Sequence, residues 1–489
     1  MRLIAYMKPY AHWVIFALLL VLGLTAFDLY RPMLVGDAID TFGANGDYDV
    51  IIATAIKYAV VLALSFAFNI AQTWILQKTG QNIILQMRKD LYRHIQSLGS
   101  RYFDITPVGK LVTRVTNDVE ALNEMYSGIL VQLFRNIVKI VGLAGVMLVL
   151  DVRLAAISFV LMPLVIGLTV LCQKIARNIY RLYRTRLTDI NTFLSEHLSG
   201  MKIIQIFGRQ ERKFEEFHDK NTKLYKAFYR EMLMYAVFRP LIYILSILSL
   251  MIVLWFGSRN VFDEIISVGT LYIFSNYIRS FFDPIQELAE QFSTLQSSIA
   301  SAEKIFTVMD EDEFIPEVEN PKQPDKITGK IEFDHVWFAY DGENYVLKDV
   351  SFVINPGEKV AFVGATGAGK SSILNLIGRY YDIQKGHIYI DGIDIRQLSK
   401  KQLRSAIGQM QQDVFIFEGD VAYNIRLNDD DITDAQVKAA AEYVNASHFI
   451  EKLPQGYHEP VTERGATFSA GERQLLSFAR TLAHNRSEE

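Results

Sequence analysis

Six apolar stretches dominate the N-terminal part of the chain, and each is close to the ~20 residues that a helix needs to cross the hydrocarbon core of a bilayer. They lie near 13–34, 52–76, 128–150, 154–173, 233–257 and 268–287. Buried helices of a soluble protein would explain one such stretch, but not six without a matching set of amphipathic helices. The pattern therefore predicts an all-α six-helix transmembrane domain over residues 1–309.

Lys and Arg are distributed unequally between the segments that join these stretches. The two long connections, 77–127 and 174–230, are basic, whereas 36–49 contains no Lys or Arg. The positive-inside rule then places the long connections in the cytoplasm, together with both termini, because the number of spans is even. Their regularly spaced apolar residues and few Pro or Gly predict helices that continue far out of the bilayer. We expect a multi-pass protein of the cytoplasmic membrane.

A few charged residues interrupt the apolar stretches: Asp28, Arg31, Arg239, Arg279 and Asp283. Ionisable residues inside a membrane are expensive and usually face protein or a wet cavity. Arg279 and Asp283 are four residues apart, so they can pair on one helix face. A neutralised structural pair, an interfacial position and a direct substrate contact all remain compatible with this spacing. Weaker candidates for a cavity wall are Asn69, Gln72, Asn276, Phe281 and Phe282.

The pattern changes after residue 309, where an acidic run and several prolines mark a linker over 310–328. Short strand-like runs follow at 331–333, 336–338 and 350–354. The apolar run 359–363 predicts a buried strand, and 371–377 predicts the start of a helix. Residues 329–489 are therefore expected to form an α/β domain.

A phosphate-binding motif lies between this predicted strand and helix. It fits G-x-x-x-x-G-K-[ST], with Gly364, Gly369, Lys370 and Ser371 at the fixed positions. The glycines let backbone N–H groups turn inward toward phosphate oxygens, and the positive helix end adds to their effect. Lys370 is expected to reach the β- and γ-phosphates, and the Ser371 hydroxyl to ligate Mg²⁺. The expected nucleotide-binding residues here are Gly364, Ala365, Thr366, Gly367, Ala368, Gly369, Lys370, Ser371 and Ser372.

Composition narrows the classes of function. Half of the 489 residues are hydrophobic and the mean hydropathy is +0.15, high for a soluble protein. The formal net charge of −4 gives no sign of a nucleic-acid partner. The single cysteine, Cys172, excludes an intramolecular disulfide. The first apolar stretch has no small-residue cleavage site after it, so we expect it to be retained as an anchor.

Two segments of the long connections carry a family resemblance. The sequences RYFDITPVGKLVTRVTNDV and FLSEHLSGMKIIQIFGRQ are similar to the two cytoplasmic loops of ABC exporter half-transporters. In that family each loop contains a short coupling helix that docks on a nucleotide-binding domain, the second on the partner's domain. The resemblance places these coupling segments near 103–109 and 196–207.

The C-terminal part resembles the ATPase of the same family over 329–489. Tyr340 matches the aromatic residue that stacks on adenine, although a core tyrosine is an alternative. The segment IGQMQQDVFIFEGDVAYNI resembles the family's Q-loop and places its Mg²⁺-sensing glutamine at Gln412. The resemblance thus implies ATP and Mg²⁺ as cofactors, with Ser371 and Gln412 on the metal.

The segment TERGATFSAGERQLLSFAR resembles the signature that gives ABC proteins their name. Ser469 and Gly471 match positions that contact the γ-phosphate bound by the opposite subunit. Glu472 stands where the family has a neutral amide, and a carboxylate near a polyanion disfavours binding. Ala470 also replaces the first signature glycine, a second departure from the family's pattern in this segment.

The printed sequence ends at Glu489, soon after the signature. The family's Walker B strand and catalytic glutamate are expected beyond this point, so no catalytic residue is assigned within the chain. His484 comes too early to be the family's switch histidine. We therefore expect the ATPase domain to be incomplete, as in a half-transporter truncated at its C-terminus.

The resemblance implies an exporter half that couples ATP binding and hydrolysis to efflux of amphipathic small molecules, drug-like or lipid. Its partner would be a second half-transporter. The replacement of the family's amide by Glu472 favours a heterodimer, because only one of its two ATP sites would then contain this carboxylate. The alternative is a homodimer in which both sites tolerate the substitution. A different function is also compatible with the sequence: a non-hydrolysing fragment that binds ATP and dimerises without transport.

Overall fold

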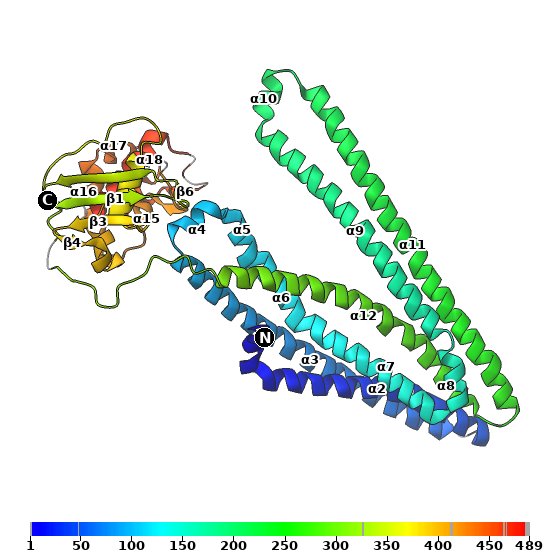
Figure 1. Cartoon of the computed structure of the whole chain (residues 1–489). Coiled ribbons are helices and arrows are strands. Elements are labelled where there is room, and N and C mark those ends of the chain that lie inside the picture. The colour runs from blue at the N-terminus through cyan, green and yellow to red at the C-terminus, as the bar shows by residue number, and fades with distance from the viewer. Residues whose placement is uncertain are drawn as a thin grey trace. The chain divides into compact units, whose positions relative to one another are not determined.

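The computed structural model describes residues 2–46, 48–324, 327–410, 414–462, 465 and 467–484. Two compact units divide the chain (Figure 1): Met1–Ile95 with Gly109–Asp310, and Gln96–Val108 with Glu311–Glu489. We call them the helical unit and the ATPase unit. Residues 96–108, which the sequence places in a cytoplasmic loop of the membrane domain, thus group with the ATPase unit.

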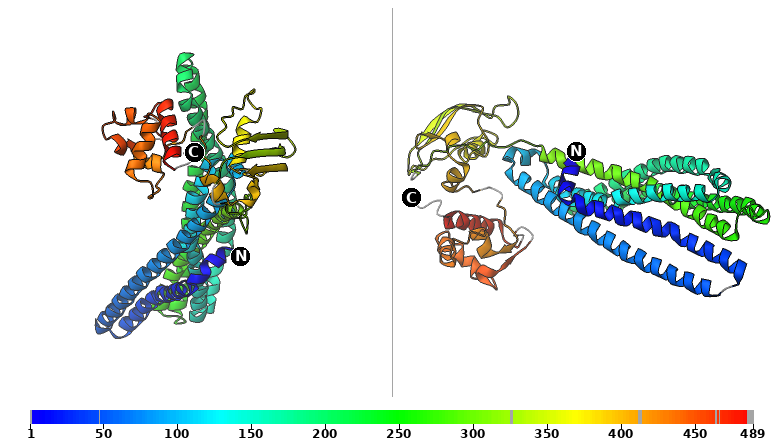
Figure 2. Two further views of the ribbon diagram at one scale, coloured as in Figure 1. Left: turned by 90° about the vertical axis from the view of Figure 1, so that its left-hand side faces the viewer. Right: turned by 90° about the horizontal axis from the view of Figure 1, so that it is seen from below.

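Long helices make up the helical unit. Its elements are α1 (Arg2–Met7), η1 (Lys8–Tyr10), α2 (Ala11–Asn45), α3 (Tyr48–Ser97), α5 (Val108–Thr113), η2 (Arg114–Asp118), α6 (Val119–Glu124), η3 (Met125–Ile129), α7 (Leu130–Leu150), α8 (Val152–Phe159), α9 (Met162–Ser199), α10 (Met201–Ile206), α11 (Gln210–Phe262) and α12 (Val268–Met309). Helices α9 and α11 run side by side and α10 joins them at one end (Figures 1 and 2). The long second connection is therefore helical.

Five helical segments of the described part are long and apolar enough to cross a membrane: Arg2–Gly43, Tyr48–Ser97, Val108–Leu150, Val152–Ser199 and Gln210–Phe262. They contain the first five predicted spans. The sixth, 268–287, lies in α12, whose N-terminal half is more polar and contains Arg279, Asp283 and Pro284. The expectation of a sixth span stays a prediction.

Helices α2 and α12 approach closely near their ends. A Cβ on Gly269 would lie 2.1 Å from the Gly36 carbonyl oxygen, so only glycine fits there. Asp40 then binds the start of α12, because its carboxylate accepts from Ser267 Oγ at 2.5 Å and from the Gly269 N–H at 2.7 Å. Deeper in the unit, buried Tyr277 donates to the Leu29 carbonyl at 2.6 Å. These contacts fasten α12 along α2.

An antiparallel sheet with the order β2-β1-β3-β4 forms one part of the ATPase unit. Its strands are β1 (Ile331–Phe338), β2 (Leu347–Ile354), β3 (Lys385–Ile390) and β4 (Ile393–Asp394), and α4 (Ser100–Ile105), α13 (Lys370–Ile377), η4 (Ile395–Gln397) and α14 (Lys400–Ser405) belong to the same unit. Phe333 stands opposite both Phe352 and Ile388, and with Leu376 it forms the core under the sheet.

A second core, which contains Phe468, Ile425 and Leu476, holds the remaining helices of this unit together. The elements around it are β5 (Gly419–Asp420), α15 (Val421–Arg426), α16 (Asp434–Tyr443), α17 (Ser447–Ile450), η5 (Gly456–His458), β6 (Pro460–Val461) and α18 (Ala470–Ala483). The α/β class expected for this part of the chain is confirmed.

The prediction of a buried strand over 359–363 is wrong for this structure. These residues form no strand, and Val363 is 91% exposed. The physical reason is pairing: among the described residues, no strand of the sheet lies beside 359–363. An apolar run becomes a buried strand only where neighbours accept its backbone hydrogen bonds and cover its side chains.

Candidate functional site

The phosphate-binding loop connects 359–363 to helix α13 in the ATPase unit. Gly367 and Gly369 have φ angles of +87° and +88°, in the left-handed region that favours glycine. A Cβ on Gly369 would also lie 2.6 Å from Leu347 Cδ2. Both the positive φ angle and this short contact therefore exclude larger residues at position 369. Gly369 then caps α13, which begins at Lys370.

The Lys370 side chain folds back over this loop. Its Nζ donates to the carbonyl oxygens of Gly364 at 2.7 Å and Ala365 at 2.8 Å. The ammonium is thereby held beside the open side of the loop, where Gly364, Ala365, Thr366, Gly367 and Ala368 are all exposed. Ser371 is exposed in the first turn of α13 and Ser372 is buried. An exposed hydroxyl at a helix start beside a lysine fits the Mg²⁺–phosphate chemistry expected of it.

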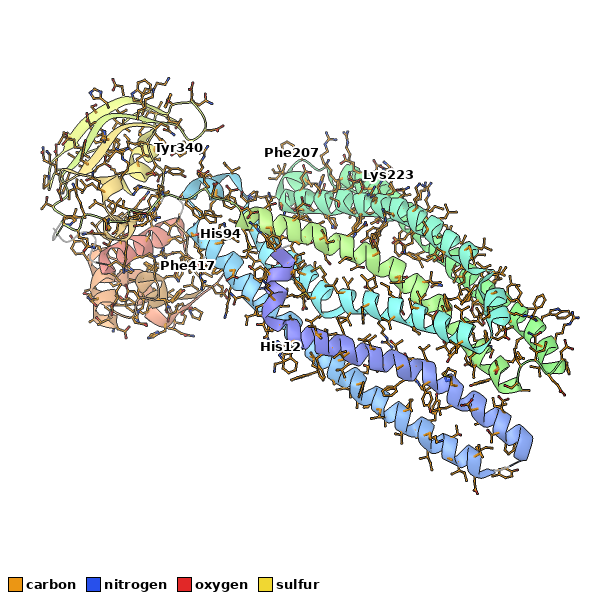
Figure 3. All side chains as sticks on the ribbon, turned by 60° about the horizontal axis from the view of Figure 1, so that its bottom comes forward. His12, His94, Phe207, Lys223, Tyr340 and Phe417 are labelled. Atoms are coloured by element: carbon orange, nitrogen blue, oxygen red, sulfur yellow. The ribbon has the colours of Figure 1, made fainter. Side chains whose placement is uncertain are left out.

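Tyr340, labelled in Figure 3, follows β1 and is half-buried. Its ring packs edge-on against Phe338 at 4.7 Å and Tyr381 at 5.1 Å between centroids. Its hydroxyl donates to Ser372 Oγ at 3.0 Å. The tyrosine thus touches the core and the P-loop helix together, so the core and adenine-stacking interpretations are compatible rather than exclusive.

Tyr381 is a residue that the sequence reasoning missed. Its hydroxyl donates to Asp104 Oδ2 at 2.6 Å, which ties the ATPase unit's sheet region to α4 of the first cytoplasmic loop. Burial raises the pKa of the Tyr381 phenol, and the hydrogen bond to Asp104 raises it further. Next to this bond, the Gly99 N–H donates to the Glu313 carbonyl at 2.7 Å. Tyr340 and Tyr381 together join the P-loop helix to the first predicted coupling segment.

The signature segment begins helix α18. Ser469 is its N-cap and accepts from the Glu472 N–H at 3.3 Å, while the Glu472 carboxylate accepts from the Ser469 N–H at 2.7 Å. This reciprocal capping box works with Glu or Gln. Ser469, Ala470 and Gly471 are exposed, whereas Phe468 is buried in the second core. The segment therefore presents a free helix start with a carboxylate folded onto it.

The assignment of Gln412 to the metal falls outside the described residues. Its neighbour Gln409 donates to Asn375 Oδ1 at 3.1 Å, on α13. In the described ranges, no group of three or more His, Cys, Asp and Glu side chains is placed to hold a metal ion.

The second predicted coupling segment, 196–207, contains the end of α9, the turn at Gly200 and helix α10. Four of its apolar side chains are exposed: Leu198, Ile203, Ile206 and Phe207. Phe207 lies beside α10, at the end of the α9–α11 pair (Figure 3). Such an exposed apolar tip suits a docking segment.

The charged residues of the predicted spans differ in their interactions. Asp28 pairs with Arg31 and with Arg135, the latter at 3.4 Å. Arg279 and Asp283 are both exposed, and no ion pair joins them among the described residues, so of the interpretations compatible with their spacing the structural pair is not formed here. The side chain of Arg239 is outside the described part.

The weaker candidates for a cavity wall also differ from one another. Phe281 and Phe282 both lie in the core of the helical unit, and Phe281 also lines an apolar cavity. Asn276 donates to the Tyr272 carbonyl within its own helix. Asn69 is exposed on α3, and Gln72 is half-buried there.

Comparisons with known proteins agree with this geometry. Residues 14–285 match the family model described as the ABC transporter transmembrane region, and residues 347–487 match the model described as ABC transporter. The chain is 38% identical to the putative ABC transporter ATP-binding protein exp8 of Streptococcus pneumoniae, over 99% of this chain and 82% of that protein.

Two further relatives carry more specific names. The probable multidrug resistance ABC transporter ATP-binding/permease protein YheH of Bacillus subtilis is 37% identical over 87% of this chain and 63% of that protein. The ATP-dependent lipid A-core flippase of Desulfotalea psychrophila is 30% identical over 96% of this chain and 81% of that protein. The chain therefore belongs to the ABC transporter family, as an exporter half-transporter in which a membrane-spanning region is fused to an ATP-hydrolysing, nucleotide-binding domain.

Proposed function

We propose that this chain binds Mg·ATP through Gly364–Ser372 and couples it, together with a second half-transporter, to the export of amphipathic small molecules, drug-like or lipid. The observation that carries the proposal is the continuous contact from Ser372 through Tyr340 and Tyr381 to Asp104. It links the nucleotide loop to a cytoplasmic loop of the membrane-spanning region. The printed names of the multidrug and lipid exporters support the substrate class.

Each predicted site residue has a proposed role in ATP-driven export. The loop amides and Lys370 hold the phosphates, Ser371 and Gln412 hold Mg²⁺, and Tyr340 supports the adenine. Ser469 and Gly471 act on the nucleotide of the opposite half, because a signature and a P-loop from different chains complete each site. The closure of the two halves then moves the coupling segments 103–109 and 196–207.

The partner is proposed to be a different subunit. In a homodimer both ATP sites would receive Glu472, whereas a heterodimer places that carboxylate in one site only. Like charges at a desolvated contact weaken association, which favours the arrangement with fewer of them. We therefore expect one site of normal affinity and one weakened site.

The proposal is tested by transport in proteoliposomes, with the chain and a candidate partner reconstituted together. Ethidium and dansyl-undecanoate serve as amphipathic probes of opposite charge. Wild type should accumulate at least one of them only when Mg·ATP is present. Lys370→Ala should weaken ATP binding roughly ten- to hundredfold, the worth of one charged hydrogen bond, and should stop accumulation.

Lys359→Ala is the matched control, because Lys359 is also exposed and lies just before the loop. It should leave ATP affinity and transport unchanged. Equal ATP affinity in wild type and Lys370→Ala would refute the nucleotide assignment. ATP binding without any transport would instead support the alternative of a non-transporting fragment.

A further inference from the structure

A large apolar cavity opens in the helical unit between α7, α9 and α12. Its volume is about 930 Å³. Aliphatic and aromatic side chains of α7 and α12 form most of its wall, among them Leu133, Ile140, Phe281 and Phe292. In Figure 1, α9 diverges from α12 toward the α10 end. A drug-sized or lipid-sized ligand fits a space of this volume.

The polar residues that line this cavity all come from α9. They are Thr169, Gln173, Lys174 and Arg177, and no carboxylate belongs to the lining among the described residues. The described part also contains no ion-pair partner for Lys174 or Arg177. The cavity therefore has one apolar side and one uncompensated basic end.

The basic end continues along one face of α9. Ile166 and Val170 line the apolar part, and Lys174 and Arg177 follow at helical spacing. Arg181 continues the same spacing toward the end of the helix. At about 1.5 Å per residue, the lining from Ile166 to Arg177 extends roughly 16 Å along the helix axis. Apolar and basic parts are thus separated along the cavity as the tail and head of an amphiphile are.

One of the polar residues of the lining carries a buried hydroxyl. Thr169 is 2% exposed and its Oγ1 has no hydrogen-bond partner. Thr residues in helices usually bond to a carbonyl of the preceding turn, and a buried polar group without a partner is costly. Thr169 is among the residues that line the cavity, but its oxygen is itself covered by protein atoms, so the head group's partners are Lys174 and Arg177.

The opposite face of α7 and α12 provides a contrast. A polar cavity there contains Arg135 and Lys139, but also Glu287, which accepts from Asn136 at 2.9 Å. Glu287 therefore offsets part of this positive charge, and Arg135 also pairs with Asp28 at 3.4 Å. Of these two cavities of the helical unit, the one beside α9 presents cations with no carboxylate among its described lining residues.

We propose that the cavity between α7, α9 and α12 binds amphiphiles with an anionic head group, carboxylate or phosphate. The tail lies against α7 and α12, and the head group lies at Lys174 and Arg177. Arg and Lys at the edge of an apolar space bind an anion more strongly than they would in water, and Arg can bind both oxygens of it. This inference rests on the proposed export function and names its substrate class.

The test measures binding of dansyl-undecanoate to the full chain in neutral phosphatidylcholine nanodiscs without nucleotide. A dansyl-undecylamine of the same length is the cationic probe, and empty nanodiscs give the background. Wild type should prefer the anionic probe at least about tenfold, the worth of one charged hydrogen bond. Lys174→Gln/Arg177→Gln should remove this preference and leave cation binding within about twofold. Arg177→Lys should retain most of it.

Lys226→Gln is the matched control, since Lys226 is exposed on α11 and does not line the cavity. Val170→Trp fills the apolar part and should weaken both probes. Competition with dodecanoate and with dodecyl phosphate then distinguishes the two head groups, and displacement by either supports the site. Equal binding of the two probes to wild type, or an unchanged preference in the double variant, would overturn the inference.

The binding test of the anionic site can fail or succeed independently of the transport test of the proposed export function. Binding is measured without ATP, so a failure of ATP-driven transport leaves this result unaffected. If ethidium and dansyl-undecanoate are both transported with ATP but the double variant transports them in the wild-type ratio, the export function stands and the anionic site is wrong.

Discussion

The hydrogen bond between Tyr381 and Asp104 allows a direct test of how the ATPase unit holds α4. Tyr381→Phe removes the donor but keeps the ring, which packs against Tyr340 at 5.1 Å and Phe338 at 5.8 Å between centroids. A hydrogen bond to a charged group contributes about 1.5–3 kcal/mol where it is buried. Asp104 is exposed, so water replaces part of the lost bond and we expect about 1 kcal/mol.

Amide hydrogen exchange in α4 measures this energy locally, because the helix must leave the unit before its amides exchange. A loss of about 1 kcal/mol should accelerate exchange over 102–106 roughly fivefold. Asp104→Asn should have a similar effect. The double variant should add little, because both single variants break one interaction.

Tyr380→Phe is the control, since Tyr380 packs under Arg404 with 4.7 Å between guanidinium and ring centroid, and its hydroxyl has no bond to α4 among the described residues. Its exchange in α4 should equal that of wild type. Unchanged exchange in Tyr381→Phe, or additive effects in the double variant, would show that the bond does not hold α4. In that case a contact other than the Tyr381–Asp104 hydrogen bond must connect the P-loop helix to α4.

Three further predictions concern stability and association. Burial tends to raise the pKa of Asp394, but hydrogen bonds from Arg396 and His387 outweigh it and lower the pKa from 3.8 to about 2. The ionised form is favoured in the folded state, so its contribution is present in full above about pH 4 and is lost as the pH falls through 2. Asp394→Asn should cost roughly 2 kcal/mol in unfolding free energy at pH 7 and roughly half of that at pH 3. Gly269→Ala should cost about 1–3 kcal/mol by forcing α2 from α12, seen as a lower melting temperature, whereas Gly145→Ala, with open space around its Cβ, should not. Glu472→Gln should keep the capping box and change the melting temperature little, but should strengthen ATP-dependent association of the two halves at low salt; equal association would show that the carboxylate does not meet the phosphates.

Sequence patterns predicted the elements whose causes are local. The long helices follow from uninterrupted apolar runs, and capping residues such as Asp151 set their ends, since its carboxylate accepts from the Leu154 N–H at 2.6 Å. The P-loop was identifiable because glycine, lysine and serine are each required at a fixed place. Gly369 shows why: its left-handed backbone and the nearby Leu347 side chain exclude any other residue.

Interactions between distant segments could not be predicted in the same way. Asp104 and Tyr381 are 277 positions apart, and neither belongs to a motif that names its partner. Arg279 and Asp283 had the right spacing to pair, yet spacing permits a contact without making it favourable when both side chains reach solvent. The strand expected over 359–363 failed for a related reason, because an apolar run specifies a strand only together with its neighbours in a sheet.

The capping box at Ser469 illustrates the limit of local physics for function. Glu472 satisfies the Ser469 N–H as Gln would, so the start of α18 is equally well built with either residue. The folded chain alone therefore gives no reason to choose the amide. Gln and Glu at position 472 would differ only toward a phosphate that another chain brings to this helix start. The phosphate would then lie beside a neutral amide or beside a carboxylate. A residue that is structurally neutral but electrostatically opposed to the incoming ligand is informative about the assembly, and it is the reason why we propose a partner whose own signature serves the P-loop of this chain.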